Sequence, residues 1–156
     1  MERTFYTVQV DRSTLAARLS EHYKETGLPP SFVRREGPYD EESVRPSAMR
    51  YRAELTIFNS EAGLSRTDDI EKLLRKEGLR HANHYEGIEF GLAHRRAFLA
   101  ALPMNMLGTV IYFRKIPFGR TRCAPAFETN GRGGVFMTTV RSANFWGAVN
   151  FLAAKL

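Results

Sequence analysis

The sequence contains very little cysteine and no long hydrophobic run. Cys123 is the single cysteine among 156 residues, so an intramolecular disulfide is excluded. The charged start, Met1-Glu2-Arg3, leads into no apolar stretch of the kind that forms a signal peptide. The longest apolar stretches, near 98–102 and 108–113, are far shorter than the roughly 20 residues needed to cross a bilayer. We therefore expect a cytoplasmic protein without membrane insertion, and leave open delivery into another cell by a phage or as an effector.

Acidic residues are scarce in the C-terminal part of the chain. Residues 1–89 contain 14 Lys or Arg and 16 Asp or Glu, whereas residues 90–156 contain nine Lys or Arg and one acid, Glu128. The second part thus carries a net charge of +8 against −2 for the first. Such asymmetry indicates an anionic partner, either nucleic acid or an acidic protein surface. The alternative is that these cations pair with acids of the first part across the fold.

Two strand–helix pairs are predicted at the start of the chain. Alternating apolar residues indicate the strands, and helical spacing followed by glycine indicates the helices. The elements are a strand at Thr4–Val10, a helix from Asp11 or Ser13 to Gly27, a strand at Ala48–Phe58, and a helix from Ser65 or Thr67 to Gly78. In the second strand, Met49, Tyr51, Ala53, Leu55 and Ile57 are predicted to face the core. The opposite face, with Arg50 and Arg52, is predicted to meet solvent or a ligand.

The remainder is predicted to be rich in strands. The alternation of Ile88, Phe90 and Leu92 suggests a strand, and 94–102 suggests a short helix. The glycine-rich segment 130–134 lies between two strands, so it is interpreted as a hairpin turn and not as a phosphate loop. Pro125 suggests that its strand lies at a sheet edge. The expected late elements are strands at Thr109–Arg114, Arg122–Glu128 and Val135–Val140, and a final helix from Ser142 or Asn144 that includes Trp146, Val149, Leu152 and Ala153.

The predicted class is therefore α+β, in a single domain covering residues 1–156. Two opening βα units are followed by an antiparallel β-meander and a C-terminal helix. Either a ferredoxin-like variant or a curved sheet with helices packed on one face suits this order. Residues 28–47 are predicted to form a long irregular loop, because they are rich in Pro, Glu and Arg and show no periodicity.

The basic meander is the first candidate site. Cations there are interleaved with the aromatic residues Tyr112, Phe113 and Phe118. Cations neutralise phosphates and exposed aromatic rings stack on bases, so the combination suggests binding of RNA or DNA. The alternative is that the aromatic residues belong to the core and the cations only rim the sheet. The candidate anion-binding residues are Arg50, Arg52, Arg114, Lys115, Arg120, Arg122 and Arg132.

The second candidate site is a cluster of histidines and glutamates. Imidazole and carboxylate groups bind transition metals, so His81, His84 and Glu86 are candidate metal ligands. A histidine can also act as a general base oriented by a carboxylate. The candidate catalytic residues are His81, His84, His94 and Glu89. The spacing is not the His-Glu-x-x-His pattern of metalloproteases, and the sequence favours no cofactor.

Three classes of function follow from these patterns. The first, and the favoured one, is a nucleic-acid-binding or nucleic-acid-associated accessory protein that uses the basic meander. The second is a small enzyme acting on an anionic nucleotide or phosphoester substrate, with a His/Glu site and with or without a metal. The third is a phage- or effector-type interaction module or inhibitor whose basic face binds an acidic protein surface.

Overall fold

The computed structural model describes residues 2–11, 39–43, 50–60, 64–115, 119–129, 135–141, 144–146 and 149–156. Three helices lie in these ranges: α2 (Thr67–Lys76), α3 (His84–Ala93) and α4 (Arg95–Ala100). The strands are β1 (Tyr6–Asp11), β2 (Tyr39–Ser43), β3 (Arg50–Ser60), β4 (Leu64–Arg66), β5 (Leu79–His81), β6 (Met104–Asn105), β7 (Thr109–Lys115), β8 (Gly119–Thr129), β9 (Val135–Arg141), β10 (Asn144–Trp146) and β11 (Val149–Lys155).

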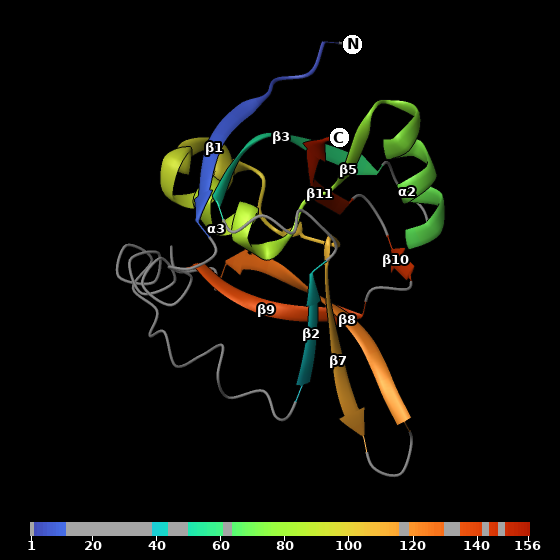
Figure 1. Ribbon diagram of the computed structural model, residues 1–156. Coiled ribbons are helices and arrows are strands. Elements are labelled where there is room, and N and C mark those ends of the chain that lie inside the picture. Colours follow the sequence, from blue (N-terminus) through green and yellow to red (C-terminus); the bar gives the residue numbers. More distant parts are fainter. Residues whose placement is uncertain are drawn as a thin grey trace.

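Nine of the strands form one curved sheet (Figure 1). Its order is β1-β3-β11-β6-β8-β7-β2, with β5 also pairing with β11 and β9 also pairing with β8. The β11–β6 pair is parallel, and the other pairs of this sheet are antiparallel. Strands β4 and β10 form a separate antiparallel pair. The predicted α+β class is confirmed, and the ferredoxin-like variant stays a prediction.

The predicted C-terminal helix is wrong, because residues 149–155 form the strand β11. This strand lies in the middle of the sheet, between β3 on one side and β5 and β6 on the other. Its four residues 151–154 are all buried. A strand covered on both faces is apolar throughout and shows no alternation, so a short run of this kind resembles a buried helix in sequence.

Helices cover both faces of the sheet, so the expectation of helices on one face is also wrong. Along β11, Leu152 and Ala154 pack into a core with α3 and α4, where Phe90 and Phe98 meet edge to face with ring centroids 6.2 Å apart. Phe151 and Ala153 pack into a second core with α2. Because successive strand residues point to opposite faces, the two cores lie on opposite sides of the sheet.

The two cores also change the predicted pattern of β3. Ala53 and Leu55 are buried as expected, and Arg50 and Arg52 are exposed. From Thr56 onward, however, the opposite face is buried as well, and Phe58 belongs to the second core. The expected solvent or ligand face of this strand is therefore confined to its first residues.

Helix α2 lies where the sequence predicts a helix. Asp68 and Asp69 occupy its first turn and Arg75 and Lys76 its last, which complements the helix dipole. The N-cap residue of the helix is Arg66, whose side chain makes no capping hydrogen bond, so the N-cap position is neither Ser65 nor Thr67 as expected. The helix is followed by Gly78, whose φ of +71° favours glycine.

Helix α3 occupies the segment in which a strand was expected. A capping box starts it: the Asn83 side chain accepts from the Glu86 amide, and the Glu86 carboxylate accepts from the Asn83 amide. The alternation of Ile88, Phe90 and Leu92 was misleading, because nearly all of this helix is buried. Helix α4 lies within the expected short helix at 94–102.

Two further expectations fail in the sheet. Pro125 lies inside it: it is paired with Thr139 of β9, and its carbonyl accepts from the amide of Met106. Within the predicted loop 28–47, residues 39–43 form β2, which pairs with β7. The rest of that loop and the helix predicted after Asp11 lie outside the described residues. Strands β1, β7, β8 and β9 match the predicted strands closely.

Close backbone contact at Gly108 leads to a testable prediction. A Cβ atom there would lie 2.6 Å from the His81 carbonyl oxygen and 2.7 Å from the Ala82 carbonyl, and the Gly108 amide donates to Ala82. Backbone cannot move aside as a flexible side chain can, so Gly108→Ala should destabilise the protein by about 3 kcal/mol. Urea unfolding followed by circular dichroism measures this loss.

Gly78→Ala is the matched control. Its Cβ would meet nothing within 4 Å, so only the left-handed backbone opposes the change, at about 1 kcal/mol. Equal losses for the two variants would contradict the role of close packing at Gly108.

Candidate functional site

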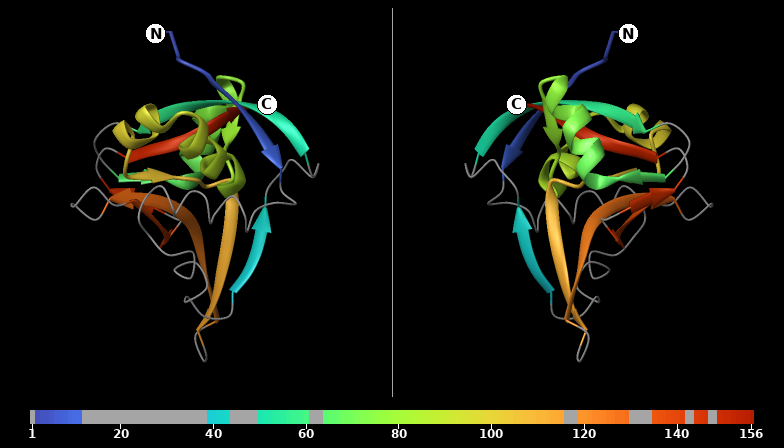
Figure 2. Two further views of the ribbon diagram at one scale, coloured as in Figure 1. Left: turned by 90° about the vertical axis from the view of Figure 1, so that its left-hand side faces the viewer. Right: turned by 90° about the vertical axis from the view of Figure 1, so that its right-hand side faces the viewer.

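The basic meander forms an antiparallel hairpin of β7 and β8. The register places Arg114 opposite Arg120, Lys115 opposite Gly119 and Tyr112 opposite Arg122. Cations separated in the sequence by the turn are thus brought to adjacent positions. In both views of Figure 2 this hairpin extends away from the helices. The structure therefore gathers four of the predicted anion-binding residues at one end of the molecule.

An acidic strand adjoins the base of the hairpin and stops short of its tip. Strand β2 contains Asp40, Glu41 and Glu42, which pair in register with Tyr112, Ile111 and Val110. Its pairing ends with Tyr39 opposite Phe113. Because β2 is the last strand in the sheet order, its charges discourage edge-to-edge association. In the register of the sheet, Asp40 shares one row with Tyr112 and Arg122.

Beyond Phe113 the described sheet narrows to two strands. Among the residues that the structure describes, β9 pairs with β8 from Cys123 onward, and β2 pairs with β7 as far as Phe113. The positions left in this two-stranded part are Arg114, Lys115, Gly119 and Arg120, which we call the hairpin tip. It contains three cations and no acid. Arg122 lies in the three-stranded part, in one row with Tyr112 and Asp40.

Arg50 and Arg52 do not adjoin the hairpin tip. Arg50 and Arg52 lie at the start of β3, which β11 and β6 separate from β8 in the sheet. Arg50 is also bonded to Asp11 of β1 through its Nε, at 3.0 Å. Arg132 lies outside the described residues. The structure therefore does not join Arg50 and Arg52 to the hairpin as one continuous track.

Glu86 of the His/Glu cluster is the centre of a buried network. Its carboxylate is fully buried and accepts from the Arg80 guanidinium at 2.6 and 3.0 Å. It also accepts from the Tyr51 hydroxyl at 3.0 Å and from the Asn83 amide at 2.9 Å. The Asn83 side-chain amide donates to the Tyr51 hydroxyl in turn, at 3.2 Å. The network joins the start of α3 to β3 and β5.

The pKa shifts in the network agree with its hydrogen bonds. Burial, and then the negative charge of Glu86, raise the pKa of Tyr51 well above its usual 10.0, so this hydroxyl keeps its proton and can donate. Burial by itself would lower the pKa of Arg80, but the hydrogen bonds and charge of Glu86 outweigh it and raise that pKa. Arg80 and Glu86 therefore form a buried ion pair whose role is to hold elements together.

Sequence reasoning missed this network but contained its signal. The pattern Asn83-x-x-Glu86 is a capping box, which marks a helix start. Arg80 and Tyr51 carried no comparable signal, because their proximity depends on the pairing of β3 and β5 with the same central strand.

His81 is the least satisfied polar side chain of the cluster. Both ring nitrogens are buried and have no hydrogen-bond partner among the described residues. Burial lowers the pKa of His81 to about 4, against the opposing effect of the negative charge of Glu71. Its ring lies 6.0 Å from that of Phe151. At neutral pH the imidazole is therefore uncharged and packed as an apolar group.

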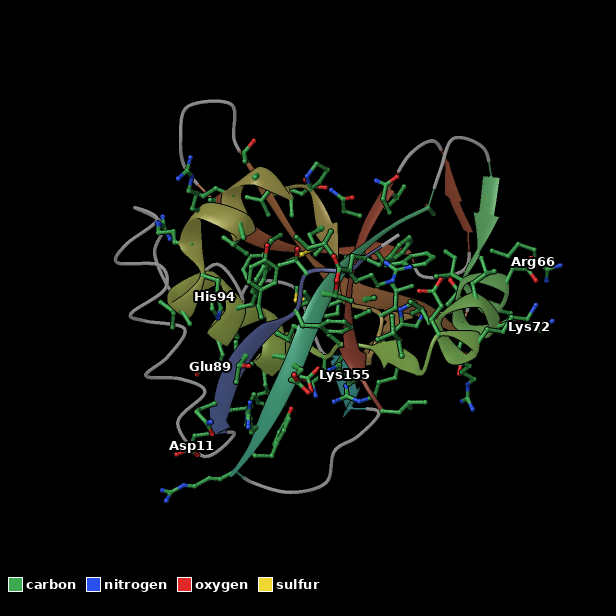
Figure 3. The ribbon with its side chains drawn as sticks, turned by 90° about the horizontal axis from the view of Figure 1, so that it is seen from above. Asp11, Arg66, Lys72, Glu89, His94 and Lys155 are labelled. Carbon is green, nitrogen blue, oxygen red and sulfur yellow. The ribbon has the colours of Figure 1, made fainter. Side chains whose placement is uncertain are left out.

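The other candidate catalytic residues lie along α3. His84 is buried, with its ring centroid 4.0 Å from that of Tyr85, and Glu89 is buried as well. Nε2 of His94 lies 2.9 Å from the Thr7 carbonyl oxygen, and since a carbonyl only accepts, this nitrogen donates. Figure 3 shows Glu89 and His94 beside β1. Of these side chains, His94 joins the end of α3 to β1 through its bond to Thr7.

The described residues contain no group of three His, Cys, Asp or Glu side chains placed to hold a metal. The predicted metal ligands His81, His84 and Glu86 are accordingly not brought together into one metal site. In the same part of the chain, no helix is long and apolar enough to cross a membrane.

An open cavity of about 670 Å³ lies between the N-terminal residues and β3. An ion pair between Arg3 and Glu77 spans its lining, with 2.6 Å between Arg3 Nε and Glu77 Oε2. The charged groups of the lining neutralise one another in part.

Compared with known protein families, curated proteins and solved structures, the chain matches none.

Proposed function

We propose that the protein binds nucleic acid through the β7–β8 hairpin, as an accessory protein and not as an enzyme. The observation that carries this proposal is the register that sets Arg114 directly opposite Arg120, next to Lys115. The nearest acids in register lie at the base of the hairpin, on β2. A cationic end of this kind is suited to a partner with closely spaced negative charges.

The pairing of Arg114 with Arg120, two like charges, supports the binding of an anionic ligand at the hairpin tip. Like charges directly opposite each other on adjacent strands destabilise a sheet, by a few tenths of a kcal/mol up to about 1 kcal/mol. A bound phosphate reverses this effect, because each guanidinium group then has an anion to contact. Arginine also forms bidentate contacts with phosphate that lysine cannot form.

The proposal predicts a salt-dependent affinity that depends on the hairpin. The double variant Arg114→Ser/Arg120→Ser should lower the slope of log K against log[salt] by about 2, since each lost phosphate contact with a duplex removes about 0.9. Fluorescence anisotropy with a labelled oligonucleotide of about 20 base pairs measures this slope. The salt concentration is varied from about 50 to about 200 mM, the range over which phosphate contacts weaken strongly.

The matched control removes two cations elsewhere. Lys72 and Arg75 are exposed on α2, where they pair with Asp69 and Glu71. The variant Lys72→Ser/Arg75→Ser has the same net charge as the hairpin variant and should keep the wild-type slope. If both variants lose the same slope, binding depends only on net charge and the proposed interface is wrong. Binding of an acidic protein without any binding of nucleic acid would instead assign the hairpin to a protein partner.

A further inference from the structure

We infer that helix α2 is a cover over one face of the sheet, and that protonation of His81 releases it while the rest of the fold stays intact. The inference is independent of nucleic-acid binding. It starts from the unequal burial of the two longer helices. Three of the ten residues of α2 are buried, whereas seven of the ten residues of α3 are.

The polar contacts of the two helices are unequal as well. Two ion pairs of α2 join residues three or four positions apart within the helix, so they do not tie it to the sheet. They are Lys72–Asp69 and Arg75–Glu71. Just beyond the helix, Glu77 accepts from Arg3 of the N-terminal segment. Helix α3, in contrast, is fixed at its start by the buried network around Glu86.

The apolar contact of α2 with the sheet is small. Ile70 and Leu74 are its buried apolar residues, and they pack into the second core with Leu79 and Phe151. An element held by few buried side chains can open locally at a lower free energy than the whole domain needs to unfold. Helix α2 can therefore separate from its face of the sheet while α3 and the first core stay in place on the other face.

His81 lies on the face that α2 covers. It is paired with Ala153 of β11, and its ring is 6.0 Å from that of Phe151; both of these neighbours belong to the second core. The two ring nitrogens are buried without a hydrogen-bond partner among the described residues. A protonated imidazole donates from both nitrogens and is costly to bury without acceptors, so protonation favours a state in which water reaches the ring.

The charged groups around the ring do not supply the missing partner. On α2, the negative charge of Glu71 raises the pKa of His81, but burial lowers it more strongly. On the neighbouring strands the cationic side chains are bonded elsewhere: Arg80 of β5 to Glu86 and Lys155 of β11 to Glu54. Separation of α2 hydrates the ring at the cost of few buried contacts, whereas access from the opposite face would disrupt the first core.

Hydrogen exchange of the backbone amides, measured by NMR, tests the inference. At pH 7 the amides of α2 should have protection factors at least about tenfold lower than those of α3. Low concentrations of urea should accelerate the exchange of α3 more than that of α2, because the urea dependence scales with the surface that opening exposes. Both results are expected if α2 opens by itself.

The pH dependence connects this opening to His81. The pKa of His81 is about 4 in the folded protein and returns towards 6.5 when the ring is hydrated, so the open state binds more protons in acid. The protection factors of α2 should therefore fall about 20-fold between pH 7 and pH 5. Global unfolding hydrates the ring too, so α3 should lose a similar factor from its higher starting value.

Two variants and the urea dependence decide the outcome. His81→Leu should keep the protection of α2 nearly constant between pH 7 and pH 5, and so should His81→Gln, which retains polar atoms but cannot be protonated in this range. Equal protection and equal urea dependence for α2 and α3 would show that the domain opens only as a whole, which overturns the inference. A wild-type α2 whose protection does not fall in acid, or falls equally in both variants, overturns it as well.

Discussion

Replacing Glu86 by glutamine is expected to lower the free energy of unfolding by about 3 kcal/mol, because it leaves the largely buried Arg80 without its counter-ion. The glutamine side chain retains one acceptor oxygen, whereas the carboxylate accepts from Arg80, Tyr51 and Asn83 together. The free energy of unfolding of most domains is about 5–15 kcal/mol, so this loss is a large part of the total stability. Urea denaturation monitored by far-UV circular dichroism measures it.

Two controls separate the buried pair from an ordinary ion pair. Glu54 accepts from Lys155 at 3.2 Å at the surface, so Glu54→Gln should cost less than about 1 kcal/mol. The double variant Arg80→Leu/Glu86→Leu removes both charges at once and should be more stable than Glu86→Gln. Equal losses for Glu86→Gln and Glu54→Gln would show that the network contributes no more than surface pairs do.

His81 should make the protein less stable as the pH falls from about 6.5 to 4. Its pKa is lowered from 6.5 to about 4 in the folded protein, so the unfolded chain binds more protons within this window. Stability is therefore fully present above pH 6.5 and is lost as the pH falls towards 4. Between pH 7.5 and pH 5 the loss assigned to this one group is about 2 kcal/mol.

The variant His81→Leu tests this assignment. Leucine cannot be protonated and leaves no buried ring nitrogen without a partner, so the variant should be more stable than the wild type at pH 7, by about 1 kcal/mol. The difference between the two should grow by about 2 kcal/mol on going to pH 5. Stability–pH curves that run parallel for wild type and variant would rule out His81 as the source of acid sensitivity.

The lowered pKa of His81 can also be checked by removing the charge of Glu71. Its negative charge raises the pKa of His81 against the effect of burial. The variant Glu71→Gln should therefore lower the pKa of His81 further, which NMR titration of the imidazole can follow. An unchanged or raised pKa would contradict the electrostatic coupling between α2 and β5.

Much of the fold could be predicted from local patterns. Strands β1, β3, β7, β8 and β9 and helix α2 lie where alternation, helical spacing and terminal glycines predict them. In β1 and β3 one face is at least partly less buried than the other, and glycine-containing turns in the sequence mark the ends of the other elements. Such signals act within a few residues. The predicted α+β class followed from them.

The errors have one cause. Residues 149–155, part of the predicted final helix, form strand β11. The alternating residues Ile88, Phe90 and Leu92 were predicted as strand and lie in helix α3. Both segments are largely buried, so the spacing of their apolar residues does not report which face meets solvent, and the alternation of Ile88, Phe90 and Leu92 occurs inside a helix. The capping box at Asn83 and Glu86 was the local signal that would have corrected the second error.

For the candidate sites, too, one part could be predicted from the sequence and the other was decided only by the tertiary structure. Composition and charge order already pointed to a cationic C-terminal part, because charge is a property of each residue by itself. Whether these cations meet, and next to which acids, depends on the pairing of β7 with β8 and β2, which join residues far apart in the chain. The packing of Glu86 against Arg80 and Tyr51, and of His81 without a polar partner, likewise arises only when separate strands and helices enclose a common core.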